Sequence, residues 1–336
     1  MRRAALIALA AGALAAPAAH AQATPHVTVG IAEEDPGFFD DARFHATGIR
    51  NARLLVPWDV VKMGGWPLQV ADLWLERARR DGVEPLISFG HSMSKKRQRR
   101  LPSVREYAAQ VRAFRARYPW VREFSTWNEA NLGSKQPTGR HPRRTAVFYR
   151  ALKKQCRGCT VVAVELLVTS NWRMWRWIRA FRKRAGPGRL IFGLHNYPDV
   201  TRLRSRGTRR FLRLVRNADV WITETGGIVR HRRFKYDEDR AARSVRYVFN
   251  LVSRLPRVQR LYLYHWRYGG NATWDSGLIS QDGTERKPYY ALLYGLSLDR
   301  FRPLPVPIAD PLAEPLPPPA VPPPAEPPPE PPPAGG

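Results

Sequence analysis

Short apolar runs alternate with segments of helical spacing through the middle of this chain. Eight runs have the composition of buried strands, at 27–31, 52–58, 84–89, 123–129, 160–166, 189–197, 219–225 and 260–266. Each is almost continuously apolar instead of alternating with polar residues. Such runs are typical of parallel strands that are covered on both faces.

Most of the intervening segments repeat apolar residues every three or four positions, which predicts helices. The clearest are 70–80, 104–118, 146–155 and 237–254, and a last helix is predicted to begin at Pro288. Strand followed by helix, repeated eight times, is the pattern of an α/β protein with a (β/α)8 TIM barrel. A doubly wound open sheet is less consistent, because no Gly-rich phosphate turn follows an early strand.

The two ends of the chain differ from this core. Residues 1–23 place two arginines before an Ala- and Leu-rich run and the small-residue pattern Ala19-His20-Ala21. This predicts a signal peptide, and hence a secreted or cell-wall-associated protein without a transmembrane segment once it is cleaved. Residues 302–336 contain 17 of the 31 prolines, so we expect 301–336 to be a disordered tail. A single catalytic domain is therefore predicted at 24–300.

The chain is strongly basic, with a formal net charge of +28 that comes from 47 Arg and 9 Lys against 28 acidic residues. Attraction to a polyanion is one interpretation, and the densest cluster, 95–100, is the place to test it. A compositional bias towards Arg is the other, because the arginines are spread along the chain. The only cysteines, Cys156 and Cys159, are expected to form a local disulfide in an exported protein.

In a (β/α)8 barrel the chemistry lies at the carboxyl ends of the strands. Polar and aromatic residues occupy these predicted ends and the positions that follow them, namely Trp58, His91, Asn128, Glu129, His195, Tyr197, Glu224, His265 and Trp266, and Glu165 lies near the end of the fifth strand. Glu129 and Glu224 belong to the fourth and seventh strands, which face each other across a narrow barrel. Paired carboxyl groups cleave glycosides with retention at ~5 to 5.5 Å and with inversion at ~6.5 to 9.5 Å.

Two motifs resemble those of a known group of enzymes. Trp-Asn-Glu at 127–129 and Ile-Thr-Glu-Thr-Gly at 222–226 are similar to the acid/base and nucleophile motifs of the clan A retaining glycoside hydrolases. These (β/α)8 enzymes include the cellulase-like family five and the xylosidase-like family thirty-nine. The segment 276–292 also looks like the stretch that follows the eighth strand in this clan. Two departures are Ala130, where the clan usually has Pro, and Tyr289 in place of Ala in its Lys-Pro-Ala sequence.

The resemblance implies a role for each candidate residue. Glu129 would be the general acid/base, which starts protonated, and Glu224 the ionised nucleophile. Asn128 would bind the sugar 2-hydroxyl, Arg53 would support the nucleophile, and either His195 or Tyr197 would contact it. Trp266 would form the floor under the reacting sugar, with Trp58, Trp127 and Trp274 nearby as further stacking surfaces.

This chemistry needs no metal and no cofactor. The sequence therefore predicts a monomeric, exported glycosidase that acts on a poly- or oligosaccharide, with an acidic glycan or cell-wall polymer as a substrate hypothesis and no specific nucleic-acid partner. The alternative is a non-catalytic carbohydrate- or polyanion-binding cell-wall protein on the same barrel.

Overall fold

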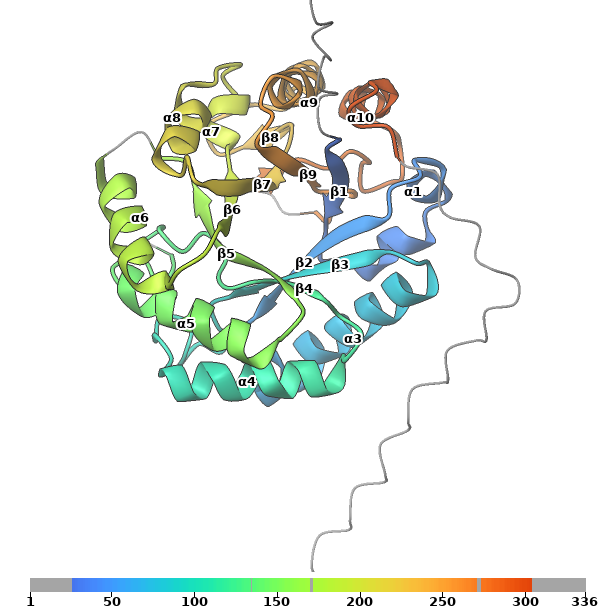
Figure 1. Cartoon of the computed structure of the whole chain (residues 1–336). Coiled ribbons are helices and arrows are strands. Elements are labelled where there is room, and N and C mark those ends of the chain that lie inside the picture. Colours follow the sequence, from blue (N-terminus) through green and yellow to red (C-terminus); the bar gives the residue numbers. More distant parts are fainter. Residues whose placement is uncertain (1–25, 134, 170–171, 271–272, 304–336) are drawn as a thin grey trace, which may run out of the picture. The chain divides into compact units, whose positions relative to one another are not determined.

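Eight parallel strands close into a barrel in the computed structural model of this chain (Figure 1). The structure describes residues 26–303 except 134, 170–171 and 271–272. The predicted signal peptide and nearly all of the predicted tail lie outside this part of the chain. Pairing of the last strand with the first closes the barrel. The strands are β1 (Thr28–Ala32), β2 (Asn51–Pro57), β3 (Glu84–Gly90), β4 (Glu123–Ser125), β5 (Thr160–Leu167), β6 (Leu190–His195), β7 (Ala218–Thr225) and β9 (Val258–Tyr264).

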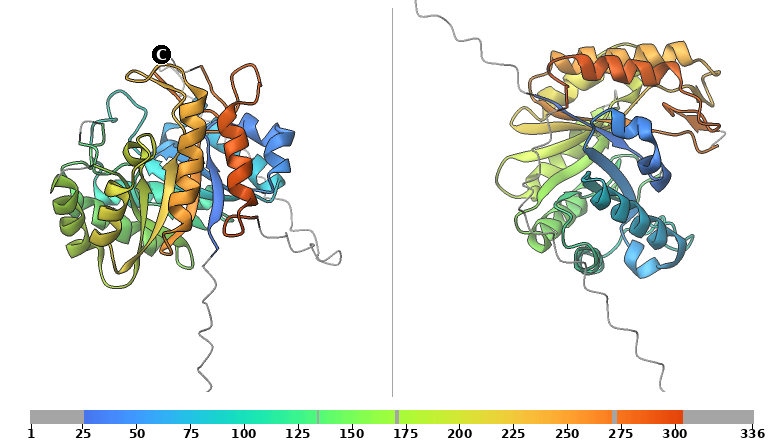
Figure 2. Two further views of the ribbon diagram at one scale, coloured as in Figure 1. Left: turned by 90° about the horizontal axis from the view of Figure 1, so that it is seen from above. Right: turned by 90° about the vertical axis from the view of Figure 1, so that its right-hand side faces the viewer.

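Helices surround the barrel, so the predicted (β/α)8 fold is confirmed. The long ones are α3 (Gly65–Arg80), α4 (Val104–Arg117), α5 (Pro142–Gln155), α6 (Trp172–Ala185), α8 (Arg206–Leu214), α9 (Glu238–Ser253) and α10 (Lys287–Ser297). Short ones follow β1, β2 and β6, namely the 3-10 helix η1 (Pro36–Asp40), α1 (Ala42–Ala46), α2 (Val60–Met63) and α7 (Tyr197–Val200). Figure 2 shows α9 and α10 side by side on the outside of the barrel.

Local sequence explains where several helices begin. At α4, Ser103 Oγ accepts the Glu106 backbone N–H at 3.1 Å, and the Glu106 carboxylate accepts the Ser103 N–H at 2.8 Å. This reciprocal capping box satisfies two donors that an unprotected helix start leaves unpaired. Pro142 and Pro288 lie in the first turns of α5 and α10, where a proline costs no helical hydrogen bond.

Apolar side chains pack in two places. The larger cluster lies between the strands and the helices. A small one lies inside the barrel and consists of Ala32, Leu86, Val162, Trp221 and Tyr262. The side chains of Arg53 and Glu165 are also fully buried. The interior of the barrel is therefore packed with side chains and includes the buried ion pair of Arg53 and Glu165.

The structure departs from the predicted strand boundaries at two positions that matter for the site. β4 ends at Ser125, so Glu129 lies in the following loop and not in the strand. β9 ends at Tyr264, and Trp266 therefore also lies beyond its strand. A two-stranded sheet that was not predicted, β8 (Arg230–His231) with β10 (Trp274–Asp275), pairs His231 with Trp274.

Cys156 and Cys159 form the expected disulfide, in the turn before β5. In the described part of the chain, no helix combines the length and apolar character needed to cross a membrane.

Candidate active site

Glu129 lies in the loop after β4, in a backbone conformation that few residues other than glycine adopt. Its φ is +45°, in the left-handed region that typically costs a non-glycine residue ~1 to 3 kcal/mol. Hydrogen bonds to β5 hold the loop in place: the Ala130 N–H donates to the Glu165 carbonyl at 3.0 Å, and the Asn131 side chain bonds both backbone groups of Leu167. A proline at 130 could not donate the first of these bonds, which gives the departure from the clan motif a structural reason.

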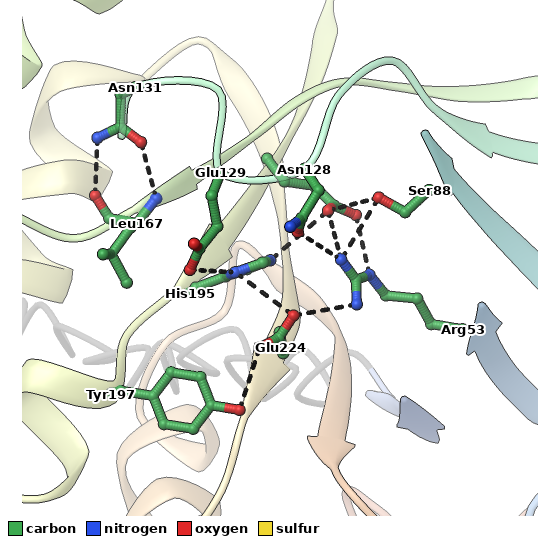
Figure 3. Close-up of polar contacts among 10 residues, drawn as sticks. Arg53, Ser88, Asn128, Glu129, Asn131, Leu167, His195, Tyr197 and Glu224 are labelled. Atoms are coloured by element: carbon green, nitrogen blue, oxygen red, sulfur yellow. Dashed lines mark hydrogen bonds and ion pairs between the residues drawn. The ribbon is translucent and has the colours of Figure 1, made fainter. Parts of the chain in front are cut away.

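Glu224 is the penultimate residue of β7 and accepts hydrogen bonds from two side chains. Arg53 Nη1 donates to Glu224 Oε2 at 3.1 Å, and the Tyr197 hydroxyl donates to Oε1 at 3.3 Å (Figure 3). Arg53 Nη2 also donates to Asn128 Oδ1 at 2.8 Å, which fixes the amide next to Glu129. The same guanidinium therefore positions residues from both sides of the barrel.

His195, at the end of β6, lies between the two candidate carboxyl groups (Figure 3). Its Nδ1 is 3.3 Å from Glu129 Oε1 and 3.7 Å from Glu224 Oε2. These two oxygens are consequently no more than about 7 Å apart, the two distances taken together. That limit includes the ~5 to 5.5 Å of retaining glycosidases and only the short end of the ~6.5 to 9.5 Å range of inverting ones.

The ring of His195 is held in its charged form by its neighbours. Burial alone would lower the pKa of His195, but Glu224, Glu129 and Glu165 raise it from 6.5 to about 9. At neutral pH the ring is therefore a cation between the two carboxyl groups.

Glu165 is the buried counterion beneath the site. Arg53 donates to both of its oxygens, at 3.1 and 2.7 Å, and the Ser88 hydroxyl donates to Oε2 at 2.7 Å. Burial alone would raise the pKa of Glu165, but the charge of Arg53 and hydrogen bonds from His195 and Arg53 lower it to about 2. Gly193 on β6 makes room for this side chain, because a Cβ there would lie 2.6 Å from Glu165 Cγ.

A cavity of about 510 Å³ opens above these groups. Its wall includes Glu129, Glu224, Asn128 and Tyr197, as the sequence predicted, and also Trp274. The cavity thus brings together a side chain of β7 and side chains that follow β4 and β6.

Two further residues of the cavity wall, Glu34 and Tyr264, were missed from the sequence. Burial and the nearby charge of Glu224 raise the pKa of Glu34 to about 7. Glu34 is the second residue after β1, so applying the strand-end rule to the first strand would have pointed to the pair Glu33 and Glu34. The neighbouring Glu33 has a different role, since its Oε2 accepts the backbone N–H groups of Trp266 and Arg267, at 3.0 and 3.1 Å.

Five predicted binding residues lie outside the cavity wall: Arg53 and His195, which contact its carboxyl groups, and Trp58, His91 and Trp266. Trp266 is fully buried and donates its indole N–H to Asp41 Oδ2 at 3.0 Å, so it does not form the expected floor. Trp58 is buried in the large core cluster. His91 is partly exposed after β3 and does not line the cavity. Of the aromatic residues expected to stack on a sugar, Trp274 is the one placed to do so.

No group of three or more His, Cys, Asp or Glu is arranged to hold a metal ion among the residues described.

Comparison with solved structures identifies the same class of fold. The enzyme GH5_18 from Streptomyces cattleya, solved in complex with GlcNAc, superposes with a TM-score of 0.60 at 15% identity and covers 82% of this chain and 80% of its own. Xylanase 10B from Thermotoga maritima superposes with a TM-score of 0.57 at 12% identity, and the match covers 81% of this chain and 95% of the xylanase. A family 39 glycoside hydrolase from Bacteroides cellulosilyticus WH2 superposes with a TM-score of 0.51 at 16% identity, and the match covers 81% of this chain and 64% of that enzyme. No family model and no curated protein matches the sequence. At these identities the likeness establishes the (β/α)8 fold that glycoside hydrolases of families 5, 10 and 39 share.

Proposed function

We propose that this protein is a retaining glycoside hydrolase with Glu129 as general acid/base and Glu224 as nucleophile. One observation carries the proposal: both carboxyl groups line one cavity at the mouth of the barrel and lie within contact distance of the same histidine nitrogen. The solved enzymes with the same fold are consistent with this activity.

The contacts of the two carboxyl groups support the assignment of their roles. Glu224 accepts hydrogen bonds from Arg53 and Tyr197, whereas His195 provides the only hydrogen bond to the Glu129 carboxyl group within the described residues. Donors that bind a carboxylate stabilise its ionised form. Glu224 is therefore the better nucleophile, and Glu129 the better proton donor to the leaving oxygen.

The reaction proceeds in two steps under this proposal. Glu224 attacks the anomeric carbon while Glu129 gives its proton to the departing oxygen, and a glycosyl-enzyme ester forms. Glu129, now ionised, takes a proton from water, which attacks the same carbon and releases Glu224. Two inversions at one carbon leave the anomeric configuration of the product unchanged.

Aryl β-glycosides test these roles in Glu129→Gln, Glu129→Ala and Glu224→Gln variants. We expect kcat to fall by about 10² to 10⁴ for Glu129→Gln, since general acid catalysis is worth that much, and further for Glu224→Gln. Azide should restore turnover of an activated aryl glycoside in Glu129→Ala and yield a glycosyl azide of retained configuration, because azide needs no general base. Glu76→Gln, at an exposed position of α3, is the matched control. Unchanged hydrolysis in all three variants would refute these roles, and the absence of hydrolysis by the wild type would favour the non-catalytic binding protein instead.

We also propose that the protein is exported, on the strength of residues 1–23 alone. N-terminal sequencing of protein from a secreting host should begin after Ala21 or Ala23. An intact Met1 would contradict export by this route.

A further inference from the structure

The side of the barrel that carries α5, α6 and α8 is far more basic than the rest, and we call it the basic face. Between Glu129 and Glu224 the sequence has 22 Lys and Arg residues but only three acidic ones, Glu165, Asp199 and Asp219. Two of these, Glu165 and Asp199, are buried. α3, α4 and α9 each contain acidic residues, whereas α5, α6 and α8 contain none. Net positive charge is therefore concentrated on one side of the barrel, which a uniform bias towards Arg does not explain.

Helix α6 adds aromatic surface to this charge; Figure 1 shows α5, α6 and α8 in succession around one side of the barrel. Trp172 and Trp175 are 55% and 41% exposed. The Arg176 guanidinium lies 4.7 Å from the ring centre of Trp172, and that of Arg179 lies 5.4 Å from Trp175. Flat ring faces suit the C–H faces of sugars, and the adjacent guanidinium groups suit carboxylate or sulfate.

Two hollows lie beside α6, and one of them adjoins the catalytic cavity. A groove of about 380 Å³ between α6 and α8 is lined by Trp175 and Lys183 among others. A second hollow, of about 660 Å³, is lined by Arg140, Arg173 and Leu132. Leu132 also lines the catalytic cavity, so the second hollow adjoins it. A polymer bound along α6 would thus pass a hollow that adjoins the catalytic cavity.

Cations also lie in the wall of the catalytic cavity. Lys135, Arg202 and Arg233 line it, and none of them forms an ion pair with a carboxylate of the described residues. Burial together with the charges of Arg233, Arg232 and Lys135 lowers the pKa of His231 in the same wall. These groups follow β4, β6 and β7, the strands on the side of the basic face. The charge therefore extends from the outer helices to the mouth of the barrel.

We propose that the basic face binds an acidic polysaccharide, with carboxylate or sulfate groups along its chain, and leads it into the catalytic cavity. Cleavage of that polymer rests on the proposed function, but its binding does not. A lipid surface fits less well, because the apolar side of α6, with Met174, Trp177 and Phe181, is buried against the barrel and cannot enter a bilayer. A nucleic acid fits less well, because the route ends at a pair of carboxyl groups suited to glycoside cleavage.

Binding of polygalacturonate tests the proposal, with neutral xylan, a DNA duplex and phosphatidylglycerol vesicles as comparison probes. One triple variant removes charge from α6, and a control removes the same charge from exposed sites on α3 and α4: Arg176→Gln/Arg179→Gln/Lys183→Gln against Arg79→Gln/Arg105→Gln/Arg112→Gln. An exposed ion pair changes an equilibrium constant by up to about fivefold, so the α6 variant should bind polygalacturonate about tenfold more weakly and the control less than twofold. Wild-type binding should weaken steeply between about 20 and 500 mM NaCl.

Each outcome decides the proposal. Equal losses in the two triple variants would show that net charge alone attracts the polymer and would overturn it, as would DNA or vesicle binding that depends on α6 to the same extent. Glu129→Gln should bind polygalacturonate like the wild type. In that variant, binding tests the role of the basic face, whereas hydrolysis tests the catalytic role of Glu129, so the two proposals can fail separately.

Discussion

Replacing Glu165 with Gln tests the charge network beneath the candidate active site. The pKa of Glu165 falls from 4.5 to about 2 on folding because Arg53 and His195 surround the buried carboxylate. Each pKa unit corresponds to 1.36 kcal/mol, so the ionised carboxylate stabilises the folded protein by about 3 kcal/mol at neutral pH. Because the folded pKa is the lower one, this contribution is complete above pH 4.5 and is lost as the pH falls through about 2.

Urea unfolding of the wild type and of Glu165→Gln at pH 7 and pH 3 measures this contribution. We expect the wild type to be more stable by about 3 kcal/mol at pH 7 and by only about 1 kcal/mol at pH 3, since Gln does not titrate. Other carboxyl groups titrate in both proteins and cancel in the difference. Glu76→Gln, which removes an exposed carboxylate, should show almost no difference at either pH.

A stability difference that stays constant between the two pH values would refute this reasoning. It would mean that the pKa of Glu165 is the same in the folded and unfolded proteins. The role of Arg53 as its counterion would then have to be abandoned. A difference that grows towards low pH would reverse the sign of the interaction.

Three further substitutions probe the cavity. Tyr197→Phe removes the hydroxyl that donates to Glu224 at 3.3 Å, and kcat for an aryl β-glycoside should fall about tenfold with little change in KM, since a hydrogen bond to a charged group is worth ~1.5 to 3 kcal/mol. Glu34→Gln should abolish an inflection near pH 7 in the wild-type pH–rate profile, because the pKa of Glu34 is about 7; an inflection that persists would assign it to another group. Trp266→Phe should destabilise the protein by about 1 to 3 kcal/mol, because it leaves the buried Asp41 carboxylate one donor short, and should leave KM unchanged; a raised KM would place Trp266 in the sugar site after all.

The barrel could be predicted because its strands are almost continuously apolar and are separated by helices of clear period. Glu224 could also be predicted, because it lies one residue before the end of a strand with a clear apolar run. Glu34 was harder to recognise, because Glu33 and Glu34 are adjacent and only packing decides which one turns to the backbone and which lines the cavity. Trp266 was misplaced because the apolar run continues past the end of β9, and its partner Asp41 is far away in the sequence. The β8–β10 pair is too short to leave a periodic signal.

His195 contacts both candidate catalytic carboxyl groups and should matter most in the second step of the proposed mechanism. In the free enzyme its cation contacts Glu129 and Glu224 together, and Arg53 adds a second positive charge on the Glu224 side only. Once Glu224 is esterified it carries no charge, and Glu129 remains as the cavity carboxyl group in contact with the imidazolium. The cation then lies beside the carboxyl group that must accept a proton from water. His195→Gln should therefore slow hydrolysis of the glycosyl-enzyme more than its formation, and a burst of aryl alcohol equal to the enzyme concentration would reveal it. A variant with no burst and a slower first step would instead assign His195 to support of the nucleophile alone.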